Sequence, residues 1–219
     1  MPIWGLRDIA LFGEGMSFIL LDKIPSYNIE KIYLNQLEQG LLQFEDFNVI
    51  TIQKKSLLKI INRCAVNIDI DSVDFCNDNK EIFLITSYVI SDVLSLDESV
   101  TFYRGVIDFI KSKGYSVVCK SHPRIDDEIN KRLQKLYSND KSVSFITNSR
   151  IPVEIMINRT KPVATVCSMS WAGLYCQFLF DIPTYGCGAD IVLKHHKDET
   201  IRKMASFFMD NTKRLEKLL

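Results

Sequence analysis

The chain has 219 residues, of which 47% are hydrophobic and 25% charged, and its 27 basic and 27 acidic side chains balance. This composition is typical of a soluble globular protein with a core of its own, and a net charge of zero gives no general attraction to nucleic acid or anionic membranes. The sequence also lacks an apolar run of transmembrane length and the pattern of a signal peptide, so we expect a cytoplasmic protein.

The first 79 residues predict an irregular α/β part. We expect strands at 8–15, 31–36 and 48–53, the first ending in a glycine turn, and a helix at 54–64. A polar, acidic segment before Lys80 would join this part to the next.

From Lys80 onward, short apolar runs alternate with segments of helical periodicity. The runs predict strands at 81–86, 115–120, 142–147, 161–168 and 182–188. Helices are expected at 96–114, 125–139, 152–158, 171–180 and 197–219, with Pro152 at the first position of the third. This alternation favours βαβ units with a parallel sheet, which binds ligands beyond the carboxyl ends of its strands. The sequence therefore predicts two domains, 1–79 and 80–219.

The last of these helices carries an apolar stripe opposite Lys and Arg side chains. We expect the stripe to dock on the protein's own fold, and contact with a membrane surface is the alternative.

The metal-binding residue types do not form a metal site. The six cysteines contain no Cys-x-x-Cys pair, so we interpret them as buried, reduced thiols; they are Cys64, Cys76, Cys119, Cys167, Cys176 and Cys187. His195 and His196 are adjacent, so their side chains diverge on a helix and no third ligand is near. We therefore expect no bound metal.

The segment "KSHPR" (120–124) places a histidine where the second strand of this sheet ends. Pro123 restricts the backbone at His122 to extended geometry, which holds the imidazole in one presentation. Lys120 and Arg124 make the surroundings basic, which suits a phosphate group. His122 is therefore a candidate ligand-binding or catalytic residue.

Two further segments offer polar groups at the same edge of the sheet. In "CSMSWAG" (167–173), Ser168 and Ser170 stand where the fourth strand gives way to a helix whose free N–H groups attract anions. In "RIPVE" (150–154), Glu154 lies in the first turn of a helix and could bind ribose hydroxyls.

The segment "FGEGMSF" (12–18) contains Gly-x-Gly, but Phe18 stands where a dinucleotide-binding motif needs its third glycine. What remains is Glu14, a carboxylate between two glycines after a predicted strand. It is a candidate general base.

In order and spacing, "GEG", "KSHPR", "RIPVE" and "CSMS" resemble the motifs of bacterial sialyltransferases of the polysialyltransferase and lipooligosaccharide sialyltransferase type. The likeness is good over residues 80–190. The family has a GT-B fold, so the resemblance implies a Rossmann-like, parallel-sheet donor-binding domain and an incomplete amino-terminal α/β domain. Because few residues precede Glu14, we expect an amino-terminally truncated enzyme in which 1–79 is a remnant of the acceptor-side domain.

The resemblance also implies a reaction. CMP-sialic acid would be the donor, and a hydroxyl of a bacterial surface glycan, in the capsule or lipooligosaccharide, the acceptor. Inversion at the anomeric carbon would need no metal or other cofactor. Glu14 would deprotonate the acceptor, although Gly13 stands where the family has a first acid.

The remaining site residues follow from the same resemblance. His122 would contact the CMP phosphate and assist its departure, and Glu154 would hold the cytidine ribose. The other residues of the donor site would be Lys120, Ser121, Pro123, Arg124, Ser168 and Ser170.

Two other functions stay open at this point. One is a CDP-polyol phosphotransferase of teichoic-acid type, which also acts on a CMP-bearing donor. The other is a non-catalytic module that binds CMP or a protein partner. Peripheral contact with the inner face of the cytoplasmic membrane and a homodimer also stay open, whereas no nucleic-acid partner is expected.

Overall fold

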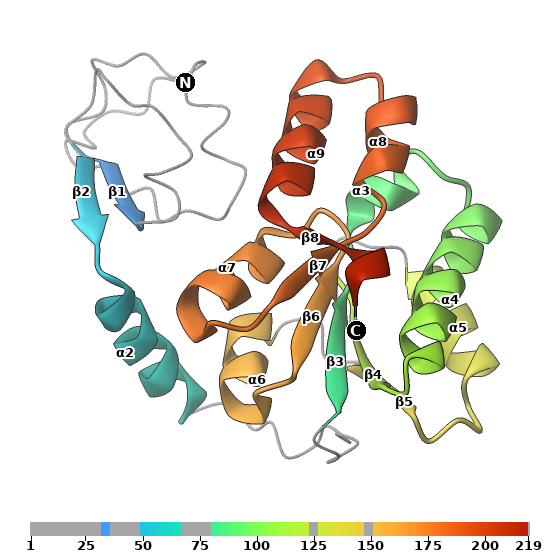
Figure 1. Cartoon of the computed structure of the whole chain (residues 1–219), viewed down its shortest axis with the longest axis horizontal. Coiled ribbons are helices and arrows are strands. Elements are labelled where there is room, and N and C mark those ends of the chain that lie inside the picture. The colour runs from blue at the N-terminus through green and yellow to red at the C-terminus, as the bar shows by residue number, and fades with distance from the viewer. Residues whose placement is uncertain (1–31, 36–48, 67–79, 123–126, 147–150, 219) are drawn as a thin grey trace, which may run out of the picture. The chain divides into compact units, whose positions relative to one another are not determined.

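The computed structural model describes residues 32–35, 49–66, 80–122, 127–146 and 151–218 (Figure 1). The chain divides into two compact units, 1–61 and 62–219, each of which is described by itself. The division expected after residue 79 stays a prediction. In the described residues, no helix is both long and apolar enough to cross a membrane.

The first unit contains a pair of short parallel strands. Strand β1 (Ile32–Asn35) pairs in register with β2 (Val49–Ile52), and helix α2 (Lys54–Ala65) begins two residues later. The predictions of two strands and a helix are confirmed here. The strand predicted at 8–15, together with Glu14, lies outside the described residues.

The second unit is built on a six-stranded sheet in which every pairing is parallel (Figure 1). The strand order is β5-β4-β3-β6-β7-β8, which is the 3-2-1-4-5-6 order of doubly wound nucleotide-binding folds. The strands are β3 (Glu81–Ile85), β4 (Ser116–Lys120), β5 (Val143–Ile146), β6 (Ala164–Cys167), β7 (Thr184–Gly186) and β8 (Lys213–Arg214). The five predicted strands and the α/β class are thus confirmed.

Helices cover both faces of this sheet. In Figure 1, α4 and α5 lie on one side of the sheet and α6 and α7 on the other. Helix α8 packs against α9 and against α3, which directly follows β3. The helices are α3 (Tyr88–Ser91), α4 (Leu96–Ser112), α5 (Asp127–Leu136), α6 (Val153–Thr160), α7 (Trp171–Phe180), α8 (Ala189–His195) and α9 (Glu199–Asn211). The short helices α3 and α8 carry too few turns to show a helical period, and the sequence did not predict them.

The core lies between the central strands and these helices. All five residues of β3 and of β4 are buried, as near-continuous apolar runs require in a parallel sheet covered on both faces. Phe83, Tyr103 and Ile107 are completely inaccessible to solvent. Full burial of one such side chain contributes about 1.5–3 kcal/mol to the stability of the fold.

Two predictions about the carboxyl-terminal region and the thiols were wrong. The helix predicted at 197–219 ends at Asn211, and the chain then forms β8 and a 3₁₀ turn, Leu215–Lys217. The reason is a tertiary contact: β8 pairs with the edge of β7, and because a Cβ at Gly186 would lie 2.3 Å from Thr212 Oγ1, only a glycine there lets the chain pass so close. Cys64 is exposed rather than buried, and it lies on α2, a helix in which no residue is buried.

The other thiols are Cys119, Cys167, Cys176 and Cys187, which are free and buried as predicted, and Cys76, which lies outside the described residues.

Candidate functional site

The strand order places three chain segments together at one edge of the sheet. Strand β3 lies between β4 and β6, and the chain changes direction across the sheet there. Ligands of doubly wound folds bind in the crevice beyond the carboxyl ends of the strands at such a point. The segments that leave those ends are Thr86–Ser87 after β3, Ser121–His122 after β4 and Ser168–Ser170 after β6.

His122 is anchored to the segment that follows β3. Its backbone N–H donates a hydrogen bond to Thr86 Oγ1 at 3.2 Å, and the N–H of Thr86 donates to the carbonyl of Lys120 at 3.1 Å. The half-buried imidazole lies against the ring of Tyr88, with 5.1 Å between the ring centroids. The histidine is thus held by neighbouring strand ends. Pro123 and Arg124 lie outside the described residues.

Lys120 is a buried cation beneath this loop. The residue is 3% exposed, and Nζ donates a hydrogen bond to the carbonyl of Ser121 at 3.1 Å. Burial lowers the pKa of the Lys120 ammonium to about 8, and the charge of Glu154 opposes that shift. Ser121 is also buried, so the positive charge of Lys120 lies inside the fold, beneath the carboxyl end of β4.

Glu154 lies in the first turn of α6, as the sequence predicted. Pro152 occupies the N-cap position, with φ −58°, one residue before the position expected for it. Desolvation of the half-buried carboxyl raises the pKa of Glu154, and the positive charge of Lys120 acts in the opposite direction. The structure thus brings together a carboxyl and an ammonium group from two of the predicted segments.

The turn between β6 and α7 has an unusual backbone. Met169 has φ 52°, a left-handed conformation, although it is a buried non-glycine residue between a strand and a helix. Such a residue costs about 1–3 kcal/mol and persists where its surroundings determine the conformation. Ser170 is the N-cap of α7, but its side chain makes no capping hydrogen bond. Its hydroxyl is therefore not used to cap the helix.

Close packing holds α7 against the sheet at this turn. A Cβ at Gly173 would lie 2.2 Å from Cys167 Sγ, so glycine permits the approach of α7 to β6. The buried hydroxyl of Thr184 donates a hydrogen bond to the Gly173 carbonyl at 2.8 Å. The amino-terminal end of α7 is thereby fixed relative to β6 and β7.

Tyr103 is a site residue that the sequence reading missed. Its spacing in the helix predicted at 96–114 is that of a core residue. Its hydroxyl instead lies 2.9 Å from Ser168 Oγ and accepts a hydrogen bond from the Ser87 N–H at 3.0 Å. The only signal in the sequence was a phenol in a helix that precedes a βα unit, which is too common to be specific.

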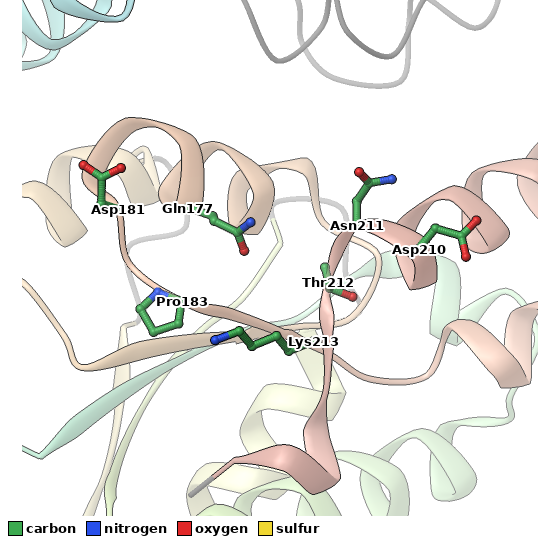
Figure 2. Close-up of a pocket in the computed structure, with 7 residues that line it drawn as sticks. All are labelled: Gln177, Asp181, Pro183, Asp210, Asn211, Thr212 and Lys213. Carbon is green, nitrogen blue, oxygen red and sulfur yellow. The ribbon is translucent and has the colours of Figure 1, made fainter.

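A cavity elsewhere on this unit contains none of the predicted residues (Figure 2). It has a volume of about 700 Å³ and is lined by Gln177, Asp181, Pro183, Asp210, Asn211, Thr212 and Lys213. Pro183 directly precedes β7 and Thr212 directly precedes β8, so the cavity lies at the amino ends of these strands. The candidate polar groups stand at the opposite, carboxyl ends of the strands, so this cavity is not the candidate site.

The described residues contain no group of three His, Cys, Asp or Glu side chains that could hold a metal ion. His195 is the last residue of α8 and is exposed, and His196 follows the helix.

Comparison with known families gives one match. The family described as alpha-2,8-polysialyltransferase (POLYST) matches residues 22–189, which is more than half of the chain. The matched range contains Lys120, His122, Glu154 and both serines of the turn, and it begins after Glu14. No curated protein sequence matched the chain.

Proposed function

The chain belongs to the alpha-2,8-polysialyltransferase family, and from this premise we propose that it moves sialic acid from CMP-sialic acid to a hydroxyl of a bacterial surface glycan. The donor, the inversion of the anomeric carbon and the independence from metal ions are all parts of the proposal. It also includes a GT-B arrangement, in which the second unit would be the donor-binding domain.

One observation carries the proposal most strongly. His122 and the buried Lys120 stand at the carboxyl end of β4, and the N-terminus of α7 follows the carboxyl end of β6, on the other side of β3. Each is a group that stabilises an anion. A monophosphate at this point would receive hydrogen bonds from two sides and positive charge from below. CMP has that phosphate, and its release is the event that the donor reaction requires.

The roles follow from what each group can do. The bond between the anomeric carbon and the phosphate oxygen breaks, and both bonding electrons go to the phosphate. His122 would donate a hydrogen bond or a proton to that oxygen, and Lys120 would stabilise the developing charge electrostatically. Ser170 and the free N–H groups of α7 would bind the other phosphate oxygens. Glu154 would accept hydrogen bonds from the ribose hydroxyls.

The acceptor hydroxyl would attack the opposite face of the anomeric carbon and lose its proton to a base. Glu14 is proposed for that base. It lies outside both the described residues and the family match, so its support comes from the sequence pattern alone.

The test begins with calorimetric titration of CMP into the unaltered chain and a His122→Ala variant. A hydrogen bond to a charged group contributes about 1.5–3 kcal/mol, so the variant should bind CMP roughly 10- to 150-fold more weakly. His195→Ala is the matched control, because His195 is exposed at the end of α8 and its loss should leave CMP affinity unchanged. Equal CMP affinity in His122→Ala and the unaltered chain would overturn the phosphate role.

Transfer is tested separately, with CMP-sialic acid and a lactoside or oligosialic acceptor. A new sialoside supports the proposed reaction. CMP binding with neither a sialoside nor free sialic acid would indicate a non-catalytic CMP-binding module. Turnover of a CDP-polyol in place of CMP-sialic acid would indicate the phosphotransferase.

A further inference from the structure

Tyr103 joins the two strand ends that border the crevice. It lies on α4, is completely buried, and its hydroxyl contacts three groups. The Ser87 N–H donates to it at 3.0 Å, the Ser87 carbonyl accepts at 3.1 Å, and Ser168 Oγ lies at 2.9 Å. Ser87 follows β3 and Ser168 follows β6. One phenol thus bridges the point where the sheet changes direction.

The Tyr103 hydroxyl has two possible acceptors for its single proton. A phenol carries one proton, so the Tyr103 hydroxyl can donate either to the Ser87 carbonyl or to Ser168 Oγ. When it donates to Ser87, the Ser168 hydroxyl satisfies its own proton by donating to Tyr103. Burial raises the pKa of Tyr103, so the phenol stays protonated near neutral pH. Tyr103 therefore acts here as a hydrogen-bonding group and not as an acid or a base.

Ser168 is oriented into the protein by this contact. Its residue surface is 0% exposed, whereas Ser170, two residues later, is 8% exposed and has a side chain not used for capping. Between them stands Met169 in its left-handed conformation. The Ser168 N–H also donates to the Ile85 carbonyl at 3.2 Å, which ties the start of the turn to β3. The first serine is thus an anchor of the turn, and the second, whose hydroxyl does not cap the helix, is the one left to bind a ligand.

We propose that Tyr103 is a positioning residue that acts through Ser168 to hold the turn presenting Ser170 and the α7 N–H groups to the donor phosphate. The inference rests on the proposed function and assigns Ser168 a different role in it. Ser168 holds the turn that presents the phosphate-binding groups and does not contact the donor.

The experiment compares CMP with cytidine as ligands of the full chain, by calorimetry for CMP and by competition for cytidine. Tyr103→Phe should lower CMP affinity about fivefold, because one neutral hydrogen bond contributes about 1 kcal/mol. Cytidine affinity should stay unchanged, since the displaced turn contacts only the phosphate. Ser168→Ala should act as Tyr103→Phe does: it should lower CMP affinity and leave cytidine affinity unchanged. It keeps the ring of Tyr103 and its contacts to Ser87, and so decides the question if the tyrosine variant fails to fold.

The double variant identifies the path of the effect. If Tyr103 acts through Ser168, Tyr103→Phe combined with Ser168→Ala should bind CMP no more weakly than either single variant. Tyr137→Phe is the matched control, because its hydroxyl also bonds to α4 but to other groups, the Asp108 carboxylate at 2.7 Å and the Arg104 carbonyl at 3.4 Å. That control should lower thermal stability without changing the ratio of CMP to cytidine affinity.

Three results would overturn the inference. The first is CMP affinity in Tyr103→Phe equal to that of the unaltered chain. The second is a double variant in which the two losses multiply, which would mean that Ser168 contacts the phosphate independently. The third is an equal loss of CMP and cytidine affinity. Absence of CMP binding by the unaltered chain would instead overturn the proposed function, and this inference with it.

Discussion

Replacing Gly173 with alanine should separate α7 from the sheet beneath it. The new Cβ would lie 2.2 Å from Cys167 Sγ and 3.1 Å from Cys167 Cβ, and Cys167 is completely buried and cannot move aside without displacing the core. Overpacking of this kind costs about 1–3 kcal/mol, and the better helix propensity of alanine returns up to about 1 kcal/mol. Because the contact is so short, we expect a net loss of about 2 kcal/mol in the free energy of unfolding.

Thermal denaturation measures this loss, and the midpoint should fall by roughly 4–8 °C. CMP affinity should fall with it, since Ser170 and the start of α7 lie within three residues of the changed position. Adding Cys167→Ala to the variant removes the sulfur and should recover part of the midpoint. Gly105→Ala on the exposed surface of α4 is the control, because a Cβ there would meet nothing within 4 Å, and it should stabilise the chain slightly. A Gly173→Ala variant as stable as the unaltered chain would refute the reasoning.

Two further predictions concern charge. Because burial lowers the pKa of Lys120 to about 8, its positive charge is present below that pH and lost above it, so CMP affinity measured by calorimetry should decrease as the pH rises through about 8. Lys120→Met should bind CMP weakly at every pH. Glu154→Gln should shift the midpoint of this decrease in affinity to lower pH, because the carboxylate raises the pKa of Lys120. CMP affinity of the unaltered chain that does not change with pH would contradict this role of Lys120. Hydrogen bonds from Lys111 and Ser142 hold the pKa of Asp140 at about 2, below its ordinary value of 3.8. The ion pair between Lys111 and Asp140 therefore stabilises the fold above pH 3.8, and this stabilisation is lost as the pH falls through about 2. Asp140→Asn should therefore lower the free energy of unfolding in urea by roughly 1 kcal/mol at pH 7, with a difference that shrinks below pH 4, and a constant difference would argue against the ion pair.

Local sequence patterns were sufficient to predict most of the strands and helices of the second unit. Strands β3 and β4 are each built around an apolar run, and α4 combines an apolar stripe with the Ser95–Glu98 capping box, so both signals lie within a few neighbouring residues. The same reasoning failed at β8, because Lys213–Arg214 is exposed and charged and carries no strand pattern. That strand exists because β7 offers an unpaired edge and Gly186 leaves room beside it.

The candidate site was predictable in its residue types and less so in their surroundings. The proline after His122 and the helix after Ser170 indicated ligand-facing positions, and strand alternation placed them at one edge of the sheet. The sequence predicted basic surroundings for His122 but did not indicate that Lys120 is buried and contacts the Ser121 carbonyl. Burial depends on elements distant in the chain, and no local pattern reports it.

By itself, the sequence determined that βα units follow Lys80 and that a histidine, a glutamate and two serines stand near strand ends, because hydrophobic period and turn chemistry are local properties. The order of the strands was decided only by the tertiary structure, since several orders satisfy the same alternation. That order puts β3 between β4 and β6 and brings Ser87 and Ser168, 81 residues apart in the chain, to the same hydroxyl of Tyr103. The different surroundings of the two serines in one turn follow from this contact, which only the folded chain makes.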